Sequence, residues 1–364
     1  MSDYFIGASV DEVDTPVLIV YLDVLERNIE YAAELFAESD VKWRPHIKGQ
    51  KVPAIAHKEV AAGAIGVTCA KLGEAEVMVY SGIDSVLIAN QIVGTSKLKR
   101  LANLCAQAEV ITAVDNEANV QNMAKAGKSK GLDIPVVVEV DIGMKRCGVQ
   151  PGQPVLQLSQ QIAELEGVTF KGVMGWEGHA RRYKDCSERK QVCRQAIQML
   201  VESARICRES GLDVEIVSCG GTGTHQFSRQ YSEVTEIQAG GIIFNDMYYS
   251  SLGLDREYAL AVLSTVTSRP QQNRIVTDAG KKTMSSDTAM PEPRGVKDVE
   301  SISFSAEHGV ITTTSPNTDL NIGDTLEWIV GYGDTTVALH DEVYGVREGQ
   351  IEVIWPILAR GKVR

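Results

Sequence analysis

The segment Arg44-Pro45-His46-Ile47-Lys48-Gly49-Gln50-Lys51 joins a short strand-like run to the first helix of a repeating strand–helix pattern. A lysine at such a junction can form a Schiff base with an aldehyde cofactor when its amine is neutral, and nearby positive charge favours the neutral form. His46 and Lys51 are candidates for supplying that charge. Most lysines that follow a strand are solvated surface groups, so Lys48 gains its significance from the rest of the chain.

Short apolar runs alternate with amphipathic helical segments from residue 41 to residue 239. We expect strands at 41–45, 65–69, 85–89, 110–114, 135–140, 169–174, 214–218 and 236–239. Helix-length segments follow these runs, which is the pattern that a (β/α)8 TIM barrel requires. A doubly wound open sheet is the alternative, and the absence of GxGxxG after the first strand disfavours it.

The pattern changes near residue 260 to short strand-like runs separated by Gly, Pro and Asp turns. Runs of this kind at 261–268, 274–278, 309–312 and 325–330 are typical of an antiparallel β domain. We therefore expect a barrel over residues 15–258 and a C-terminal antiparallel β domain over residues 259–364. Residues 1–14 are expected to pack on the β domain.

Composition disfavours several classes of protein. The 364-residue chain carries a formal net charge of −12, which argues against nucleic acid or an anionic membrane as a partner. Its seven cysteines are scattered and form no CxxC pair, as expected for reduced thiols in a cytosolic protein. No signal-like N-terminus and no long uncharged apolar run is found, so we expect a cytoplasmic protein.

In a (β/α)8 barrel, the loops at the carboxyl ends of the strands form the active site. The fifth expected strand leads into residues 141–149, where glycines flank Arg146. An arginine cannot lose its proton, so Arg146 is a fixed donor for an anionic or phenolic oxygen. The alternative interpretation of Arg146 is a structural salt bridge beneath the loop.

The sixth expected strand leads into residues 175–183, which contain Glu177, His179, Arg181 and Arg182. An acid and an imidazole at one strand end offer a general base, and a guanidinium can bind a second carboxylate of a substrate. The alternatives are a hydrogen-bonded loop histidine and solvated arginines.

Glycine-rich loops follow the last two expected strands, at residues 218–225 and 238–241. Glycines let backbone amides converge on an anion, and Thr222 and Thr224 can add hydroxyl donors. Barrels often bind phosphate at these two loops, although tight turns alone would also explain the glycines. A Schiff-base lysine after the first strand and a phosphate cup after the last two together indicate pyridoxal 5'-phosphate (PLP).

The sequence also resembles the fold type III PLP enzymes related to alanine racemase, and among them the D-threonine aldolase and D-serine dehydratase group. The resemblance covers nearly the whole chain. It rests on six segments, RPHIKGQK (44–51), DIGMKRCGV (141–149), GGTGT (220–224), EIQAGGIIFND (236–246), DAGKKTMSSD (278–287) and AEHG (306–309). It implies a homodimer in which the partner's β domain completes each site, with Asp278 and Ser285 near the neighbouring site.

The resemblance also implies roles for individual residues. It makes Lys48 the lysine that binds PLP, Arg146 the donor near the phenolic oxygen of the cofactor, and His179 the histidine close to the substrate hydroxyl. The phosphate cup that it implies consists of Gly221, Thr222, Gly223, Gly240 and Gly241.

Many members of this group carry a His-x-Cys or His-Cys-Asp sequence near the C-terminus that binds a divalent metal such as Mn, Mg or Zn. The corresponding stretch here is residues 331–337, where Tyr332 stands in place of the ligating histidine and Asp334 is the one matching ligand. A neutral phenol is a poor ligand for zinc or manganese. The resemblance therefore leaves metal dependence open.

The resemblance implies a lyase that cleaves a D-3-hydroxy amino acid into glycine and an aldehyde. A D-serine or D-3-hydroxyaspartate dehydratase is the main alternative, because the outcome depends on which substrate bond stands perpendicular to the cofactor plane. An amino-acid racemase would need a base on each face of PLP, and only Lys48 is clearly placed for one. A non-catalytic PLP-binding protein would not need the residues after 260, and a metal-dependent hydrolase would need clusters that six scattered histidines do not form.

Overall fold

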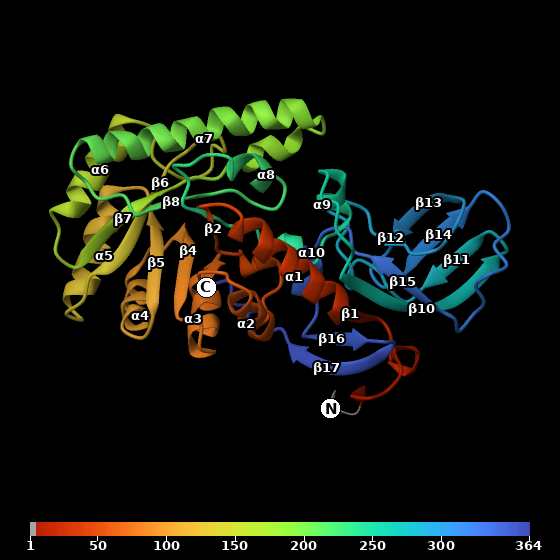
Figure 1. Cartoon of the computed structure of the whole chain (residues 1–364). Helices are drawn as coiled ribbons and strands as arrows, with labels where there is room; N and C mark the ends of the chain where they lie inside the picture. Colours follow the sequence, from red (N-terminus) through yellow and green to blue (C-terminus); the bar gives the residue numbers. More distant parts are fainter. Residues whose placement is uncertain (1–4) are drawn as a thin grey trace. The chain divides into compact units, whose positions relative to one another are not determined.

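The computed structural model describes residues 5–364 and divides the chain into two compact units (Figure 1). The first, which we call the barrel unit, consists of Tyr31–Lys48, Pro53–Gly240 and Gly361–Arg364. The second, which we call the β unit, consists of the described residues up to Glu30, Gly49–Val52 and Gly241–Arg360. The long helix α1 (Leu22–Ala37) runs from the β unit into the barrel unit.

The barrel unit contains eight parallel strands in the order β2-β9-β8-β7-β6-β5-β4-β3. They are β2 (Lys42–Trp43), β3 (Val67–Cys69), β4 (Ser85–Gln91), β5 (Glu109–Val114), β6 (Ile134–Glu139), β7 (Val168–Met174), β8 (Ile216–Cys219) and β9 (Glu236–Ile237). A parallel bridge between His46 and Thr68, with a hydrogen bond from the Thr68 N–H to the Pro45 carbonyl, joins the two edges of this sheet. The eight expected strands and the TIM-like architecture are confirmed.

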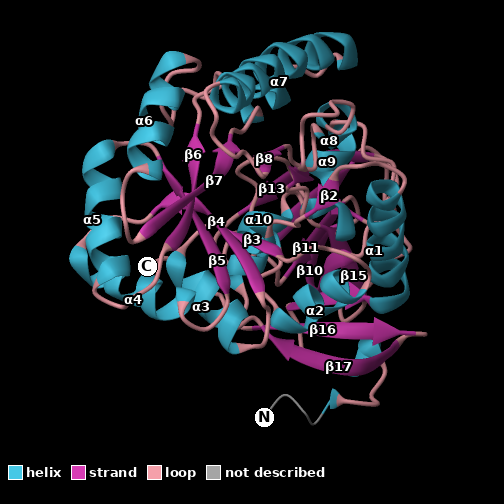
Figure 2. Cartoon of the chain, turned by 60° about the vertical axis from the view of Figure 1, so that its left-hand side comes forward, coloured by secondary structure: helices cyan, strands magenta, loops and turns pink. Residues whose placement is uncertain are grey.

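Helices follow the strands and cover the outside of the sheet (Figure 2). They are α2 (Pro53–Ala61), α3 (Leu72–Tyr80), α4 (Thr95–Cys105), α5 (Glu117–Lys128), α6 (Gln153–Ala163), α7 (Cys186–Glu209) and the short α8 (His225–Ser228). Side-chain caps fix where some of them begin: Asn116 accepts the Asn119 N–H at α5, and Asp185 accepts the Glu188 N–H at α7. None of the helices in the described part of the chain is long and apolar enough to cross a membrane.

The β unit is built on a mostly antiparallel sheet in the order β13-β14-β11-β10-β1-β16-β17, with β15 pairing with both β10 and β12. The strands are β1 (Val17–Tyr21), β10 (Leu260–Gln271), β11 (Arg274–Thr277), β12 (Glu292–Pro293), β13 (Val299–Phe304), β14 (Gly309–Thr313), β15 (Thr325–Ile329), β16 (Glu342–Arg347) and β17 (Gln350–Pro356). Two short helices, α9 (Met247–Ser251) and α10 (Gly333–Thr336), complete it. The expected antiparallel β domain is confirmed.

The two units do not follow the expected domain boundaries. The β unit includes the described residues up to Glu30, and it resumes at Gly241, earlier than the expected start at residue 259. Strand β1, which we expected at the start of the barrel domain, pairs antiparallel with β10 and parallel with β16. Its sequence VLIVY is buried on both faces, and the sheet of the β unit supplies both partners. Of the segment 1–14, the described part contacts this sheet, since the Gly7 N–H donates to the Ile351 carbonyl. Residues 1–4 lie outside the described residues.

A buried ion pair lies where the barrel closes. Arg44 Nε donates to Glu236 Oε2 at 2.9 Å, which ties the end of β2 to β9, and the two side chains are only 5% and 3% exposed. Arg44 Nη1 donates to Ser85 Oγ on β4. The arginine therefore spans the seam between the first and last strands of the barrel, and Gly66 leaves it room, because a Cβ there would lie 2.8 Å from Nη1.

We predict that Arg44→Met lowers the free energy of unfolding by about 3–5 kcal/mol, because it leaves the Glu236 carboxylate buried without a charged partner. Urea unfolding followed by circular dichroism measures the change. The double variant Arg44→Met/Glu236→Leu should recover most of the loss, and Arg27→Met, which breaks an exposed pair with Glu257, should cost less than about 1 kcal/mol. An Arg44→Met protein as stable as the parent would contradict this role.

Candidate active site

Lys48 lies five residues after the end of β2, in a single 3-10 turn formed by Ile47–Gly49. Its backbone N–H faces His46 Nδ1 at 3.4 Å, and its side chain is half-buried. The Lys48 ammonium nitrogen lies 5.4 Å from the ring centroid of Trp176, which follows β7. The structure thus places Lys48 at the carboxyl end of a barrel strand, where the sequence predicted it.

Three cationic side chains from three different loops lie around the Trp176 ring. The guanidinium carbons of Arg146 and Arg181 lie 5.1 Å and 4.8 Å from its ring centroid, on the scale of the Lys48 distance. The negative face of an indole attracts cations and so partly offsets the repulsion between them. Sequence reasoning did not single out Trp176; the signal available was an aromatic residue at a strand end beside Glu177 and His179.

Arg146 is also held by a buried carboxylate. Its Nη2 lies 3.7 Å from Oε1 of Glu139 at the end of β6, while half of the Arg146 side chain remains exposed. Gln91 on β4 donates to the other oxygen of Glu139 at 2.5 Å. Burial raises the pKa of Glu139, and the contacts with Gln91 and Arg146 oppose that rise. Arg146 therefore combines a structural ion pair with an accessible guanidinium, and sequence reasoning missed both Glu139 and Gln91.

His179 packs against the loop after β6. A Cβ at Gly143 would lie 2.7 Å from the His179 ring, so only glycine leaves space for the imidazole there. His179 Nδ1 is buried and has no hydrogen-bond partner within residues 5–364. Burial lowers the pKa of His179, and the Arg182 charge adds to this, while Glu177 and Asp141 oppose it. The lowered pKa favours the neutral form of the imidazole near pH 7.

Glu177, which the sequence offers as a general base or a substrate contact, is engaged within the barrel unit. Its side chain is fully buried, Oε2 accepts the Gly220 N–H at 3.2 Å, and Oε1 accepts the Ser228 hydroxyl. Both oxygens are thus used to fix the start of the glycine-rich loop and the short helix α8. This arrangement supports a positioning role for Glu177 in place of direct contact with substrate.

The glycine-rich loop after β8 forms a tight turn, in which the N–H groups of Thr224 and His225 both donate to the Gly221 carbonyl. Thr222 and Thr224 are buried here. A Cβ at Gly221 would lie 3.2 Å from Trp176 Nε1, which places this loop beside the indole. His225 donates Nδ1–H to the Thr222 carbonyl, and burial lowers its pKa to about 4, so it supports the loop as a neutral ring.

Gly240, at the end of the loop after β9, touches the segment that carries Lys48. A Cβ at this position would lie only 2.1 Å from the His46 carbonyl oxygen, so the close approach of the two backbones requires glycine. Gly241 begins the 3-10 turn Gly241–Ile243 of the β unit, and its carbonyl accepts the Asn245 N–H.

The two arginines after His179 differ in exposure. Arg181 is half-buried over Trp176, while Arg182 is exposed.

These side chains fit a phosphorylated aldehyde cofactor. The barrel unit brings together a primary amine, a guanidinium beside it on the same indole, a neutral imidazole and a glycine–threonine loop next to that indole. An amine takes an aldehyde, a guanidinium binds a phenolic oxygen, and backbone amides with threonine hydroxyls bind a phosphate.

The β unit contains the remaining predicted site residues. Tyr332 donates its hydroxyl to Asp334 Oδ2 at 2.7 Å. Asp278 accepts the Thr15 hydroxyl and the Thr265 N–H, and Ser285 is buried. In the part of the chain that the structure describes, no group of three or more His, Cys, Asp or Glu side chains is arranged to hold a metal ion.

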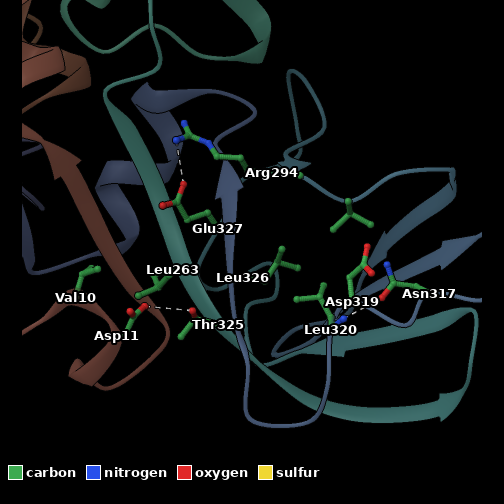
Figure 3. A pocket seen from close by; sticks show the side chains of 12 residues that line it. Val10, Asp11, Leu263, Arg294, Asn317, Asp319, Leu320, Thr325, Leu326 and Glu327 are labelled. Atoms are coloured by element: carbon green, nitrogen blue, oxygen red, sulfur yellow. Dashed lines mark hydrogen bonds and ion pairs between the residues drawn. The ribbon is translucent and has the colours of Figure 1, made fainter. Parts of the chain in front are cut away.

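The β unit also has a pocket of about 330 Å³, which Figure 3 shows from close by. Arg294 in its wall is paired with Glu327 at 3.1 Å, and Thr325 donates to Asp11 across it. None of the site residues described above lines this pocket, and Arg294 in its wall is already paired with Glu327, so we assign it no ligand.

Comparisons with known proteins agree with this geometry. Residues 20–247 match the family model for the alanine racemase N-terminal domain, and residues 259–346 match that for a putative serine dehydratase domain. The chain is 36% identical over 359 residues to D-threonine aldolase from Arthrobacter sp, covering 98% of this chain and 95% of that protein. It is 33% identical over 367 residues to 3-hydroxy-D-aspartate aldolase from Paracoccus denitrificans, covering 98% and 94%.

The crystal structure of D-threonine aldolase from Filomicrobium marinum matches with a TM-score of 0.95 at 35% identity, covering 99% of each chain. The chain therefore belongs to the alanine racemase N-terminal domain family, the fold type III PLP enzymes. Within that class it belongs to the group that contains D-threonine aldolase and the D-serine dehydratases.

Proposed function

We propose that this protein is a PLP-dependent lyase that cleaves D-3-hydroxy amino acids between Cα and Cβ to give glycine and an aldehyde. The observation that carries the proposal is the convergence of Lys48, Arg146 and Arg181 on Trp176, beside the glycine-rich loop. The two aldolases reported above, which match 98% of this chain, support the same reaction.

In this proposal, three groups of residues hold the cofactor. Lys48 takes its aldehyde, and Arg146 donates to its phenolic oxygen. The phosphate is held by Gly221, Thr222, Gly223, Gly240 and Gly241. Glu139 acts behind Arg146 as a positioning residue, because its buried carboxylate fixes the guanidinium on the side away from the open surface.

When bound, PLP supplies an electron sink for the electron pair released from the breaking Cα–Cβ bond. His179 accepts the proton of the substrate β-hydroxyl on a ring nitrogen, because the Cβ–O bond gains double-bond character only as that proton leaves. Burial suits His179 to this step, since its lowered pKa keeps the ring neutral near pH 7. Gly143 and the loop after β7 orient the imidazole.

A dehydratase is the second candidate. It would remove the proton on Cα and expel the β-hydroxide, with the same residues around the cofactor. The match of residues 259–346 to a putative serine dehydratase domain favours it, as does 28% identity over 278 residues to D-threo-3-hydroxyaspartate dehydratase from Delftia sp., which covers 75% of this chain and 73% of that protein. The higher identity over a longer range to the aldolases places the aldolase first.

We also propose a cytoplasmic homodimer with shared active sites, as the family resemblance implies. Asp278 accepts hydrogen bonds from Thr15 and Thr265 within its own chain. The support for a shared site is therefore the family resemblance.

We predict that the holoenzyme converts D-threonine to equimolar glycine and acetaldehyde. Amino-acid analysis measures glycine, an alcohol dehydrogenase assay measures acetaldehyde, and a glutamate dehydrogenase assay measures ammonia. L-Threonine is the control substrate and should give none of these products at a comparable rate. Ammonia with a 2-oxo acid and no glycine would overturn the aldolase proposal and support the dehydratase.

We predict that Arg181 favours substrates with a second carboxylate, such as D-3-hydroxyaspartate, because its half-buried guanidinium lies over Trp176 with Lys48 and Arg146. Arg181→Ala should lower the ratio of kcat/KM for D-3-hydroxyaspartate over D-threonine by roughly ten- to a hundredfold. The exposed neighbour provides the control, since Arg182→Ala should leave the ratio within about twofold. An unchanged ratio in Arg181→Ala would remove the assignment.

A further inference from the structure

Tyr332 and Asp334 form a closed pair at the start of α10. The Tyr332 hydroxyl donates to Asp334 Oδ2 at 2.7 Å. Tyr332 is the N-cap residue of α10, and Asp334 lies in its first turn. The phenol therefore donates its proton to Asp334, which the family resemblance implies as a metal ligand.

The tyrosine ring is fixed where it stands. Tyr332 is 9% exposed, and its ring packs edge-on against Tyr248 at 5.4 Å and Tyr249 at 5.9 Å between centroids. Leu252 and Leu254 belong to the same apolar cluster. Swinging the hydroxyl away from Asp334 would require this cluster to repack, so the pair is a built feature of the β unit.

The other carboxylate oxygens nearby are also engaged. Asp334 Oδ1 lies against the backbone of Gly49, since a Cβ there would be 2.6 Å away, and Gly49 directly follows Lys48 in the chain. Asp246 uses Oδ2 to accept the Gly333 N–H and Oδ1 to accept the Tyr249 N–H, which fixes the starts of α10 and α9. Both Asp246 oxygens thus accept backbone N–H groups, one from α10 and one from α9.

A divalent metal needs several anionic or imidazole donors at one point. The neutral phenol of Tyr332 supplies none, and it covers one oxygen of Asp334 with its own proton. Within residues 5–364 no third His, Cys, Asp or Glu completes a metal-binding group around this pair. The donor set at this position therefore does not fit zinc or manganese.

We propose that Tyr332 makes this enzyme independent of a divalent metal, with the Tyr332–Asp334 hydrogen bond standing where its relatives are expected to hold a metal. Tyr332 is thus the residue that decides metal binding in this chain. Exchanging it for histidine removes the covering phenol and places an imidazole two residues from Asp334. The kinetic part of this inference rests on the proposed lyase function, whereas metal binding is measured without turnover.

The test is Mn²⁺ binding to the purified holoenzyme after EDTA treatment and dialysis, followed by electron paramagnetic resonance and isothermal titration calorimetry. The parent should bind no stoichiometric Mn²⁺ at up to about 1 mM and should keep its lyase rate within twofold in EDTA. Tyr332→His should bind Mn²⁺ at least tenfold more tightly than the parent. Tyr332→Phe, which removes the hydroxyl without adding a ligand, should bind no metal, and Tyr332→His/Asp334→Asn should lose the gain.

One equivalent of Mn²⁺ bound tightly by the parent, and lost in Asp334→Asn, would overturn the proposal. A folded Tyr332→His protein with no gain in Mn²⁺ affinity would overturn the assignment of Tyr332 as the deciding residue. If Tyr332→His does not fold, the titration of the parent decides alone. A parent without lyase activity that also binds no metal would remove the proposed function and leave the metal assignment standing.

Discussion

The buried ion pair between Arg44 and Glu236 is the interaction on which the active-site geometry depends. It joins β2 to β9 where the barrel closes. Arg44 lies four residues before Lys48, and Glu236 lies four residues before Gly240, so one contact fixes the strands that lead to both Lys48 and the proposed phosphate loop. Beyond this ion pair, the segment that carries Lys48 and the loop after β9 meet again, where Gly240 approaches the His46 carbonyl.

The charged residues of the site form two sets, one cationic and one of buried carboxylates. Lys48, Arg146 and Arg181 surround Trp176, while the carboxylates of Glu139 and Glu177 are buried behind them and fix Arg146 and the glycine-rich loop. A chain with a formal net charge of −12 thus presents a local cationic site, which suits an anionic cofactor and an amino-acid carboxylate. The buried carboxylates fix these neighbours, and in the proposed function the three cationic side chains contact the ligand.

The sequence predicted the eight barrel strands, the β domain and the positions of Lys48 and Arg146, because strand periodicity is local and a barrel places every strand end at one face. It could not identify Trp176, Glu139 and Gln91 as parts of one cluster, since Gln91 and Glu139 are 48 residues apart and meet only through the order β4-β5-β6. The apolar run VLIVY of β1 predicted a buried strand without indicating which sheet would pair with it. Nor does sequence reveal that both oxygens of Glu177 are used internally.

The binding of the PLP aldehyde by Lys48 is the step on which the proposed function rests. Borohydride reduction of the holoenzyme, followed by proteolysis and peptide mass spectrometry, tests it most directly. We expect a pyridoxyl phosphate group on Lys48 alone, and loss of both the label and the visible absorption band in Lys48→Ala. A label on any other lysine, or a holoenzyme that takes no label, would contradict it.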